Sequence, residues 1–333
     1  MLSLAHFAKS SEYATDRDLV RIIRFAIVSL IVCSLHAQQP EKSIRGQQSL
    51  NGGWLFKRQA SPGAAVEAEF IGAEKPGYDT LSWSAVVLPH TWDATPDHPF
   101  TVPHHFRGLG WYRRSFVVPD DWQGRRVFIH FKGVCQIADV WINGQHAGSH
   151  TGGFTGFEFD ITPYMTWKTP NVIAVRVNDV LDEDVAPANE TNVPVYGGIY
   201  RSVYLVATGP IHVPMDGTRV TAEQSGSNVF VNVRTWLTNA GMNAQEVRVH
   251  TAIEDAQGAT VASFDSNVNL NPGATTELSQ RSQPLANAHL WSPDSPYLYR
   301  LSTAISRGSQ LADAVSTSFG IRFMGHDPAN GFT

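Results

Sequence analysis

Cysteine is scarce in this chain. The 333 residues contain two cysteines, Cys33 and Cys135, and Cys33 lies in an apolar N-terminal stretch typical of a removable leader. Loss of that stretch would leave Cys135 alone, which excludes an intrachain disulfide. Cys135 lies in a strand-like segment, where we expect a small buried core residue. The alternative, a catalytic thiol, requires a histidine partner that the sequence alone does not place.

An excess of basic charge is also lacking. Lysine and arginine number 25 against 30 aspartate and glutamate residues, which gives a net charge of −5 and a pI near 6.2. Nucleic-acid binding depends on basic side chains that displace phosphate counterions, so we predict no nucleic-acid partner. The hydrophobic content of 42% and charged content of 17% predict a globular chain, not a disordered one.

The apolar runs are too short to cross a bilayer. The most apolar run, Phe25–Leu35, is shorter than the roughly 20 residues that a spanning helix requires. Arg21 and Arg24 precede it and Ala37 follows, which is the pattern of a secretory signal peptide. We therefore predict a signal peptide over residues 1–37, with a long polar leader, and export to the periplasm or the cell exterior. An uncleaved anchor or a buried helix is the alternative.

Motifs for nucleotide, metal or serine-hydrolase chemistry are missing as well. The chain has no phosphate-binding loop, no dinucleotide fingerprint and no G-x-S-x-G elbow. Its 13 histidines form no ligand pattern. His146 and His150 would stand about 13 Å apart on a strand, whereas zinc–nitrogen bonds are about 2 Å long. We predict no metal site and no cofactor.

The sequence does contain many short strand-like segments. They alternate apolar and polar residues and are separated by Gly, Pro, Asn or Asp. In the first half of the chain they are Trp111–Val118, Arg126–Phe131, Ile137–Asn143, Asn171–Val177 and Ile199–Ala207. Asn143-Gly144 predicts a tight hairpin turn, because both residues tolerate positive φ angles. This pattern predicts an all-β fold that begins with a jelly-roll β-sandwich.

The composition changes around Ala207–Pro214, from Trp, Gly and His to Val, Thr, Ser and Asn. The strand-like segments beyond this point are Thr218–Gln224, Asn228–Leu237, Glu246–Ile253, Ala259–Phe264, Tyr297–Ile305 and Ala314–Phe323. Their number and spacing predict an immunoglobulin-like β-sandwich held without a disulfide.

Acidic and aromatic side chains are candidates for carbohydrate chemistry, in which carboxylates act as acids and bases and rings stack on sugars. The densest acidic group, in one polar loop, is Asp179, Asp182, Glu183 and Asp184. Such neighbouring carboxylates are either solvated or, for one of them, directed at a ligand. The aromatic candidates, each either core or ligand platform, are Trp92, Trp111, Trp141, Trp167 and Tyr196. Tyr196 is the first choice, because it directly precedes Gly197-Gly198.

Seven segments together resemble the N-terminal half of glycoside hydrolase family 2, the family of β-galactosidases, β-glucuronidases and β-mannosidases. In chain order they are Leu50–Arg58, Val86–Ala94, Gly108–Pro119, Val140–Thr162, Tyr196–Val206, Leu290–Leu301 and Phe319–Phe332. The resemblance covers about residues 47–333. It implies a jelly-roll sugar-binding domain, an immunoglobulin-like domain and then a (β/α)₈ barrel with a pair of catalytic glutamates.

This resemblance sets the expected domains: a galactose-binding-like jelly roll over 38–209, an immunoglobulin-like sandwich over 210–322, and the start of a missing barrel over 323–333. The barrel's W-G-x-x-N-E phrase does not occur in the sequence, so we assign no catalytic residue. The implied function is the non-catalytic N-terminal part of an exported, β-galactosidase-like enzyme that hydrolyses terminal β-linked sugars with retention. Its implied partners are a β-glycoside and the missing barrel.

The resemblance also suggests two substrate-binding residues, Asp184 and Tyr196. Relatives often carry a D-x-P-P-like loop before the G-G-I-Y-R phrase, and Asp184–Pro187 is the nearest match, with Ala186 where proline is common. A freestanding carbohydrate-binding module and a structural, adhesin-like protein remain alternatives.

The last residues give one further expectation. Phe319–Phe323 alternates like a strand and Asn330-Gly331 predicts a hairpin turn. Without its partner this segment is expected to form an exposed edge, which favours self-association and a possible homo-oligomer.

Overall fold

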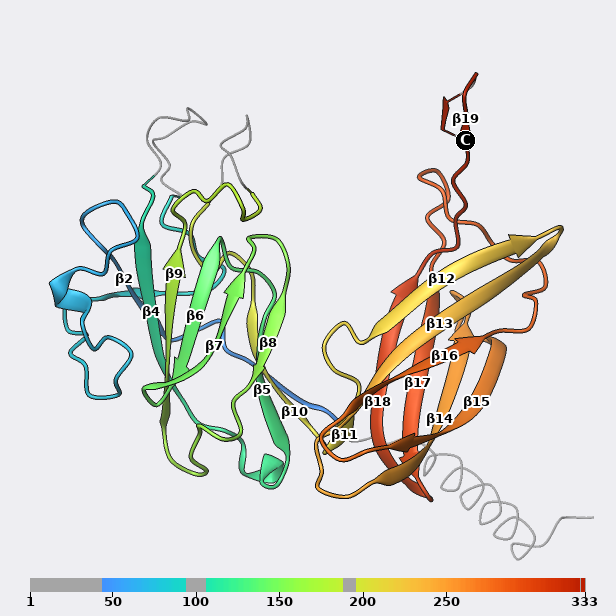
Figure 1. The fold of residues 1–333 in the computed structure, drawn as a ribbon, viewed down its shortest axis with the longest axis horizontal. Helices are drawn as coiled ribbons and strands as arrows, with labels where there is room; N and C mark the ends of the chain where they lie inside the picture. Colours follow the sequence, from blue (N-terminus) through green and yellow to red (C-terminus); the bar gives the residue numbers. More distant parts are fainter. Residues whose placement is uncertain (1–43, 94–105, 188–195, 330, 333) are drawn as a thin grey trace, which may run out of the picture. The chain divides into compact units, whose positions relative to one another are not determined.

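The computed structural model describes residues 44–93, 106–187, 196–329 and 331–332; the predicted signal peptide lies outside them. They form two β-sandwiches (Figure 1), and the predicted all-β fold is confirmed. The only helical elements among them are the short 3-10 turns η1 (Ala68–Phe70) and η3 (Asp120–Trp122). Within the described ranges, no helix has the length and hydropathy that a membrane span needs.

The first sandwich packs a six-stranded sheet against a four-stranded sheet. The six-stranded sheet contains, in spatial order, β3 (Ser84–Val86), β2 (Trp54–Arg58), β4 (Leu109–Phe116), β9 (Asn171–Asn178), β6 (Ile137–Ile142) and β7 (Gln145–Thr151). The four-stranded sheet contains β1 (Gly46–Ser49), β10 (Val203–Thr208), β5 (Arg126–Phe131) and β8 (Phe157–Asp160). Alternation along β5 buries Val127, Ile129 and Phe131 in the core between the sheets, as the period of two requires.

The hairpin predicted at Asn143-Gly144 joins β6 to β7. Both residues have positive φ, 52° and 81°, which is the geometry of a type I′ turn. The Asn143 side chain also accepts a hydrogen bond from the Val172 amide (2.9 Å) and donates one to Asn171 (2.8 Å). The turn is therefore fixed to the start of β9, and this prediction is confirmed.

The second sandwich has two four-stranded sheets. In the first, β13 (Asn228–Asn239) pairs with β11 (Ile211–His212), β12 (Thr218–Ser225) and β16 (Thr275–Arg281). The second has the order β15 (Thr260–Leu270), β14 (Gln245–Glu254), β17 (Tyr299–Arg307) and β18 (Gln310–Phe319). The core between the two sheets of the second sandwich contains two apolar clusters, one around Val231 and Leu301 and the other around Leu237 and Ile305.

The segment that follows β18 corrects the expectation of an exposed edge. β18 ends at Phe319, and Ile321 is fully buried, with its carbonyl accepting a hydrogen bond from the Trp291 amide (2.7 Å). Ile321 and Phe323 pack on the core of the second sandwich, whereas β18, which contains Phe319, is the last strand of its sheet. Self-association stays a prediction. A short hairpin follows, β19 (His326–Asp327) with β20 (Gly331–Phe332); Asn330 of the predicted turn lies outside the described residues.

Truncation of Ile321 tests this correction. We expect Ile321→Ala to lower the free energy of unfolding by about 2–5 kcal/mol, because it leaves a cavity in a closed core. Met324→Ala is the matched control: Met324 is 73% exposed, and its truncation should change the stability by less than about 0.5 kcal/mol. Urea denaturation measures both. Equal, small effects would show that residues 320–325 are not part of the core.

Candidate functional site

Loops from both sheets of the first sandwich converge at one end, which we call the loop end. In the six-stranded sheet, β4 and β6 start where β9 and β7 finish. In the four-stranded sheet, β8 and β10 start where β5 finishes. The loop end comprises residues 87–93, 106–108, 132–136, 152–156, 179–187 and 196–202, at the top of the green sandwich in Figure 1.

The pair Gly197-Gly198 is tied to two other loops by its backbone. Gly198 exchanges two hydrogen bonds with Cys135, at 3.0 and 3.1 Å. The Gly197 amide donates to Oδ2 of Asp93 (3.0 Å). The chain that leads into β10 is therefore anchored to the β5–β6 loop and to the segment after β3.

Both glycines are required by close contacts. A Cβ on Gly197 would lie 2.2 Å from the Trp92 ring and 2.3 Å from Oδ2 of Asp179. A Cβ on Gly198 would lie 2.7 Å from the Tyr112 hydroxyl, and its φ of 130° disfavours any L side chain. Trp92 and Tyr112 are in turn held by the Phe56 ring, at 5.8 and 4.7 Å between centroids.

Asp179 is the most buried carboxylate of the loop end. It is 1% exposed, and it accepts hydrogen bonds from the Gly108 amide (2.7 Å) and from Nη1 of Arg107 (3.3 Å). Burial raises its pKa to about 7, and the charge of Asp93 adds to the rise, while the two donors act in the opposite direction. Asp179 is thus a structural group beneath the surface, although the sequence suggested a solvated or ligand-directed one.

The loop that carries Asp184 is fixed by side chains of the sandwich. Gln136 donates through Nε2 to the carbonyls of Val185 (2.7 Å) and Pro187 (2.9 Å), and the Gly153 amide donates to the Ala186 carbonyl (2.8 Å). Asp184 itself is exposed, as are its neighbours Asp182 and Glu183. The fold therefore presents a free carboxylate on an anchored loop.

Tyr196 is the exposed member of the aromatic candidates. Its exposed fraction is 38%, whereas Trp111 is 3% exposed and stacks between Phe70 and Trp141. Trp92 and Trp167 are partly buried and pack against the core. Tyr196 and Asp184 both belong to the loop end, because their loops are anchored to the adjacent residues Cys135 and Gln136. The structure brings the stems of the two predicted residues together; the intervening residues 188–195 are not described.

Cys135 is 4% exposed, and burial, followed by the nearby Asp179 charge, raises its pKa to about 12. The thiol is therefore protonated near neutral pH, as expected of a core residue and not of a nucleophile. Among the described residues, no group of three or more His, Cys, Asp or Glu side chains could hold a metal ion.

Sequence reasoning missed three residues that shape the loop end: Asp93, Arg107 and Gln136. Asp93 directly follows the "PHTW" segment, which could have drawn attention to it. Arg107 and Gln136 carry no local signal, because their partners Asp179 and Val185 lie 72 and 49 residues away in the sequence.

Two consecutive β-sandwiches, the first with a loop-bearing end, define the structural class of this chain. Residues 47–209 match the family model described as "Glycosyl hydrolases family 2, sugar binding domain", and residues 211–322 match "Glycosyl hydrolases family 2". The chain therefore belongs to glycoside hydrolase family 2, and the predicted family is confirmed.

Two curated relatives are similar over most of this chain. A β-galactosidase of Bacteroides ovatus is 33% identical over 300 residues, which are 87% of this chain and 33% of the relative. A β-glucuronidase of Formosa agariphila is 32% identical over 282 residues, 78% of this chain and 29% of the relative. This chain thus spans about a third of the length of the curated relatives it matches.

Solved structures show the same relationship. A Bacteroides uniformis β-glucuronidase superposes with a TM-score of 0.76 at 28% identity, covering 87% of this chain and 34% of the other. The structure of a putative β-galactosidase from Bacteroides fragilis gives a TM-score of 0.76 at 28% identity and covers 87% of this chain and 43% of the other.

Adding a methyl group at the glycine pair tests the packing of the loop end. Gly197→Ala should destabilise the first sandwich by roughly 2–3 kcal/mol, because the new Cβ overlaps the Trp92 ring and the Asp179 carboxylate. Gly52→Ala, where a Cβ meets no atom within 4 Å, should stay within about 0.5 kcal/mol of the parent chain. Thermal or urea unfolding measures the difference, and a tolerated Gly197→Ala would contradict the described contacts.

The titration of Asp179 gives a pH prediction with a definite sign. Its pKa rises from an ordinary 3.8 to about 7 on folding, so between these values the folded chain binds more protons than the unfolded chain. The contribution to stability is present below pH 4 and is lost as the pH rises through 7. Asp179→Asn removes this titration.

We therefore expect the unfolding free energy of the parent chain, relative to Asp179→Asn, to fall from pH 4 to pH 7 and to level off above pH 8. Denaturant titrations at a series of pH values measure this difference, in which the other ionisable groups cancel. A difference that instead rises with pH would show that the Arg107 pair outweighs burial.

Proposed function

We propose that this chain is the non-catalytic N-terminal part of an exported family 2 β-glycosidase, and that its loop end forms one wall of the sugar pocket. The observation that carries this proposal is the loop end, where anchored loops from both sheets present Asp184 and Tyr196 to solvent. The order of the two family matches supports it.

The proposed parent reaction is retaining hydrolysis of a terminal β-linked sugar. It needs two carboxyl groups about 5–5.5 Å apart on either side of the scissile bond, and we place both in a barrel that packs with this chain. We propose a β-galactoside as the substrate, in line with the relatives named β-galactosidase. A β-glucuronide is the second candidate, because other relatives are named β-glucuronidase.

Asp184 and Tyr196 have chemistry suited to a pocket wall. A free carboxylate accepts hydrogen bonds from sugar hydroxyl groups, and such charge-assisted bonds are stronger than neutral ones. Tyr196 is 38% exposed, and a tyrosine ring can stack on the apolar face of a pyranose. Because both loops are anchored, little conformational freedom would be lost on binding.

Two other functions remain candidates for the chain. A freestanding carbohydrate-binding module would bind a glycan without a barrel, and Tyr196 is the feature that favours it. A structural, adhesin-like protein would use the sandwiches as spacers and would need neither residue. Export through residues 1–37 belongs to the proposal in each case, as does a homo-oligomer.

Activity and binding assays separate these functions. We expect residues 38–333 alone to hydrolyse neither chromogenic β-galactosides nor β-glucuronides, and calorimetry to detect no more than weak binding of the free sugars. Tight glycan binding by this chain would favour the freestanding module. Turnover that disappears when one of its own acidic side chains is altered would contradict the proposal.

The role of Asp184 is tested in the enzyme encoded by the complete reading frame, which we expect to contain a W-G-x-x-N-E phrase after residue 333. Asp184→Asn should lower kcat/KM by about 10- to 100-fold, since a charged hydrogen bond to substrate is lost. Glu183→Gln, at the exposed neighbouring position, is the matched control and should leave kcat/KM within about twofold of the parent value.

A further inference from the structure

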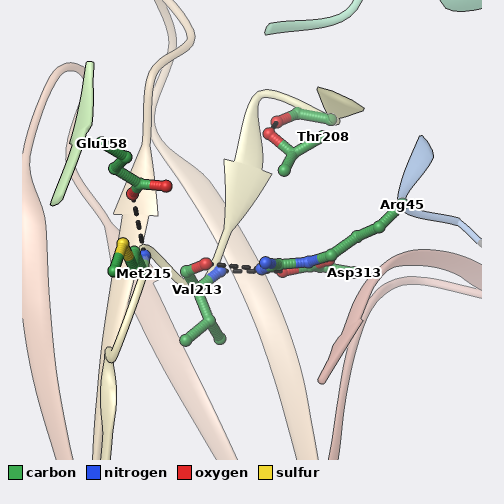
Figure 2. Close-up of polar contacts among 7 residues, drawn as sticks. Arg45, Glu158, Thr208, Val213, Met215 and Asp313 are labelled. Carbon is green, nitrogen blue, oxygen red and sulfur yellow. Dashed lines mark hydrogen bonds and ion pairs between the residues drawn. The ribbon is translucent and has the colours of Figure 1, made fainter. Parts of the chain in front are cut away.

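The residue in front of β1 contacts the second sandwich. β1 pairs with β10 in the four-stranded sheet of the first sandwich. Arg45 nevertheless binds Asp313 in β18, 268 residues away, through Nε to Oδ1 (2.8 Å) and Nη2 to Oδ2 (2.6 Å). Figure 2 shows Arg45 and Asp313 next to Val213. Val213 lies in the linker, residues 209–217, which joins β10 to β12 and includes the short strand β11.

Val213 closes a ring of hydrogen bonds with this ion pair. Its amide donates to Oδ2 of Asp313 (2.8 Å), and its carbonyl accepts from Nη2 of Arg45 (2.5 Å). Three parts of the chain that are distant in sequence therefore meet in one closed set: the N-terminal segment, the linker and β18. We call Arg45, Val213 and Asp313 the Arg45 clamp.

The burial of Asp313 makes the clamp more than a surface ion pair. The Asp313 side chain is 0% exposed, and that of Arg45 is 23% exposed. A β-bulge between Ile305 and Ser306 on the partner strand leaves one extra residue in β18 beside Asp313, and bulges re-aim side chains. A carboxylate removed from water is tolerated only when it is paired and hydrogen-bonded, so Asp313 requires Arg45.

A second contact holds the same linker to the first sandwich. The Met215 amide donates to Oε1 of Glu158 in β8 (2.8 Å), as Figure 2 shows. At the other end of the linker, the Thr208 hydroxyl donates to the Gly209 carbonyl (3.0 Å), where β10 ends. The linker thus has hydrogen-bonded contacts to both sandwiches within a few residues.

We propose that Arg45 is an interdomain clamp: the N-terminal segment, held in the first sandwich by β1, fixes the linker and the edge strand of the second sandwich. Without Arg45, each sandwich keeps its own core and the linker amides become free to exchange. The clamp acts on the coupling between the sandwiches and does not depend on any sugar or catalytic partner.

Hydrogen–deuterium exchange of linker residues 213–217 in residues 38–333 tests the clamp. Arg45→Met keeps the aliphatic part of the side chain and removes the guanidinium, and it should raise exchange of this segment about tenfold or more. Exchange in β13, β14 and β17 should stay unchanged. The matched control is Arg234→Met, which removes an exposed arginine paired in the same two-point manner with Glu277 and should leave the linker unchanged.

A double-mutant cycle then identifies the partner. Asp313→Asn alone should also raise linker exchange. In the double variant, the fold-increase in the exchange rate should be smaller than the product of the two single fold-increases, because both substitutions remove the same interaction. If Arg45→Met yields too little folded protein, Arg45→Lys, which keeps the charge and loses the fork, should give a smaller increase of about threefold.

Three results would overturn the clamp. Linker exchange in Arg45→Met equal to that in Arg234→Met would make Arg45 an ordinary surface residue. A fold-increase in the double variant equal to the product of the two single fold-increases would show that Arg45 and Asp313 act separately. Faster exchange throughout β13, β14 and β17 would show that Arg45 supports the second core itself and not its coupling to the first.

Discussion

The absence of side chains at Gly197 and Gly198 is the constraint on which the loop end depends. These residues lead into β10 of the four-stranded sheet, and they lie against Tyr112 and Asp179, which belong to the other sheet and the loop after it. A single Cβ would push the two layers apart at this point. Because the layers meet here without side chains, the loops on either side have fixed stems, and the exposed residues they carry have defined positions.

Two aspartates among the described residues are buried in the same kind of hydrogen-bonded setting. Asp179 at the loop end and Asp313 at the linker each accept from a backbone amide and from an arginine, Arg107 and Arg45 respectively. Pairs of this kind contribute little net stability compared with apolar packing, but breaking one leaves an uncompensated charge. Their main effect is therefore to select one arrangement of the chain: at Asp179 the contact between residues 107–108 and the loop after β9, and at Asp313 the position of the linker.

The sequence predicts those elements that a local pattern of residues marks. Arg126–Phe131 coincides with β5, since its alternating residues face one core. β16 (Thr275–Arg281) was not predicted, because it is polar and becomes a strand through pairing with β13. Ile199 was expected to start β10, which begins at Val203, since the residues after Gly198 are held by the bridge to the β5–β6 loop. The exposure of Asp184 could be anticipated from its polar loop, whereas its anchoring depends on a distant glutamine that no local pattern marks.

β10 runs from the loop end to the linker and connects the two. It starts a few residues after the glycine pair and ends at Thr208, before the linker, and it pairs without a register break with β1 on one side and β5 on the other. A strand of this length spans about 20 Å, and pairing on both edges prevents it from shifting along its axis. Arg45 precedes β1, whose first residue pairs with Ala207, so Arg45 lies at the end of β10 that is nearer the linker. The position of the linker relative to the loop end is thus set by paired strands.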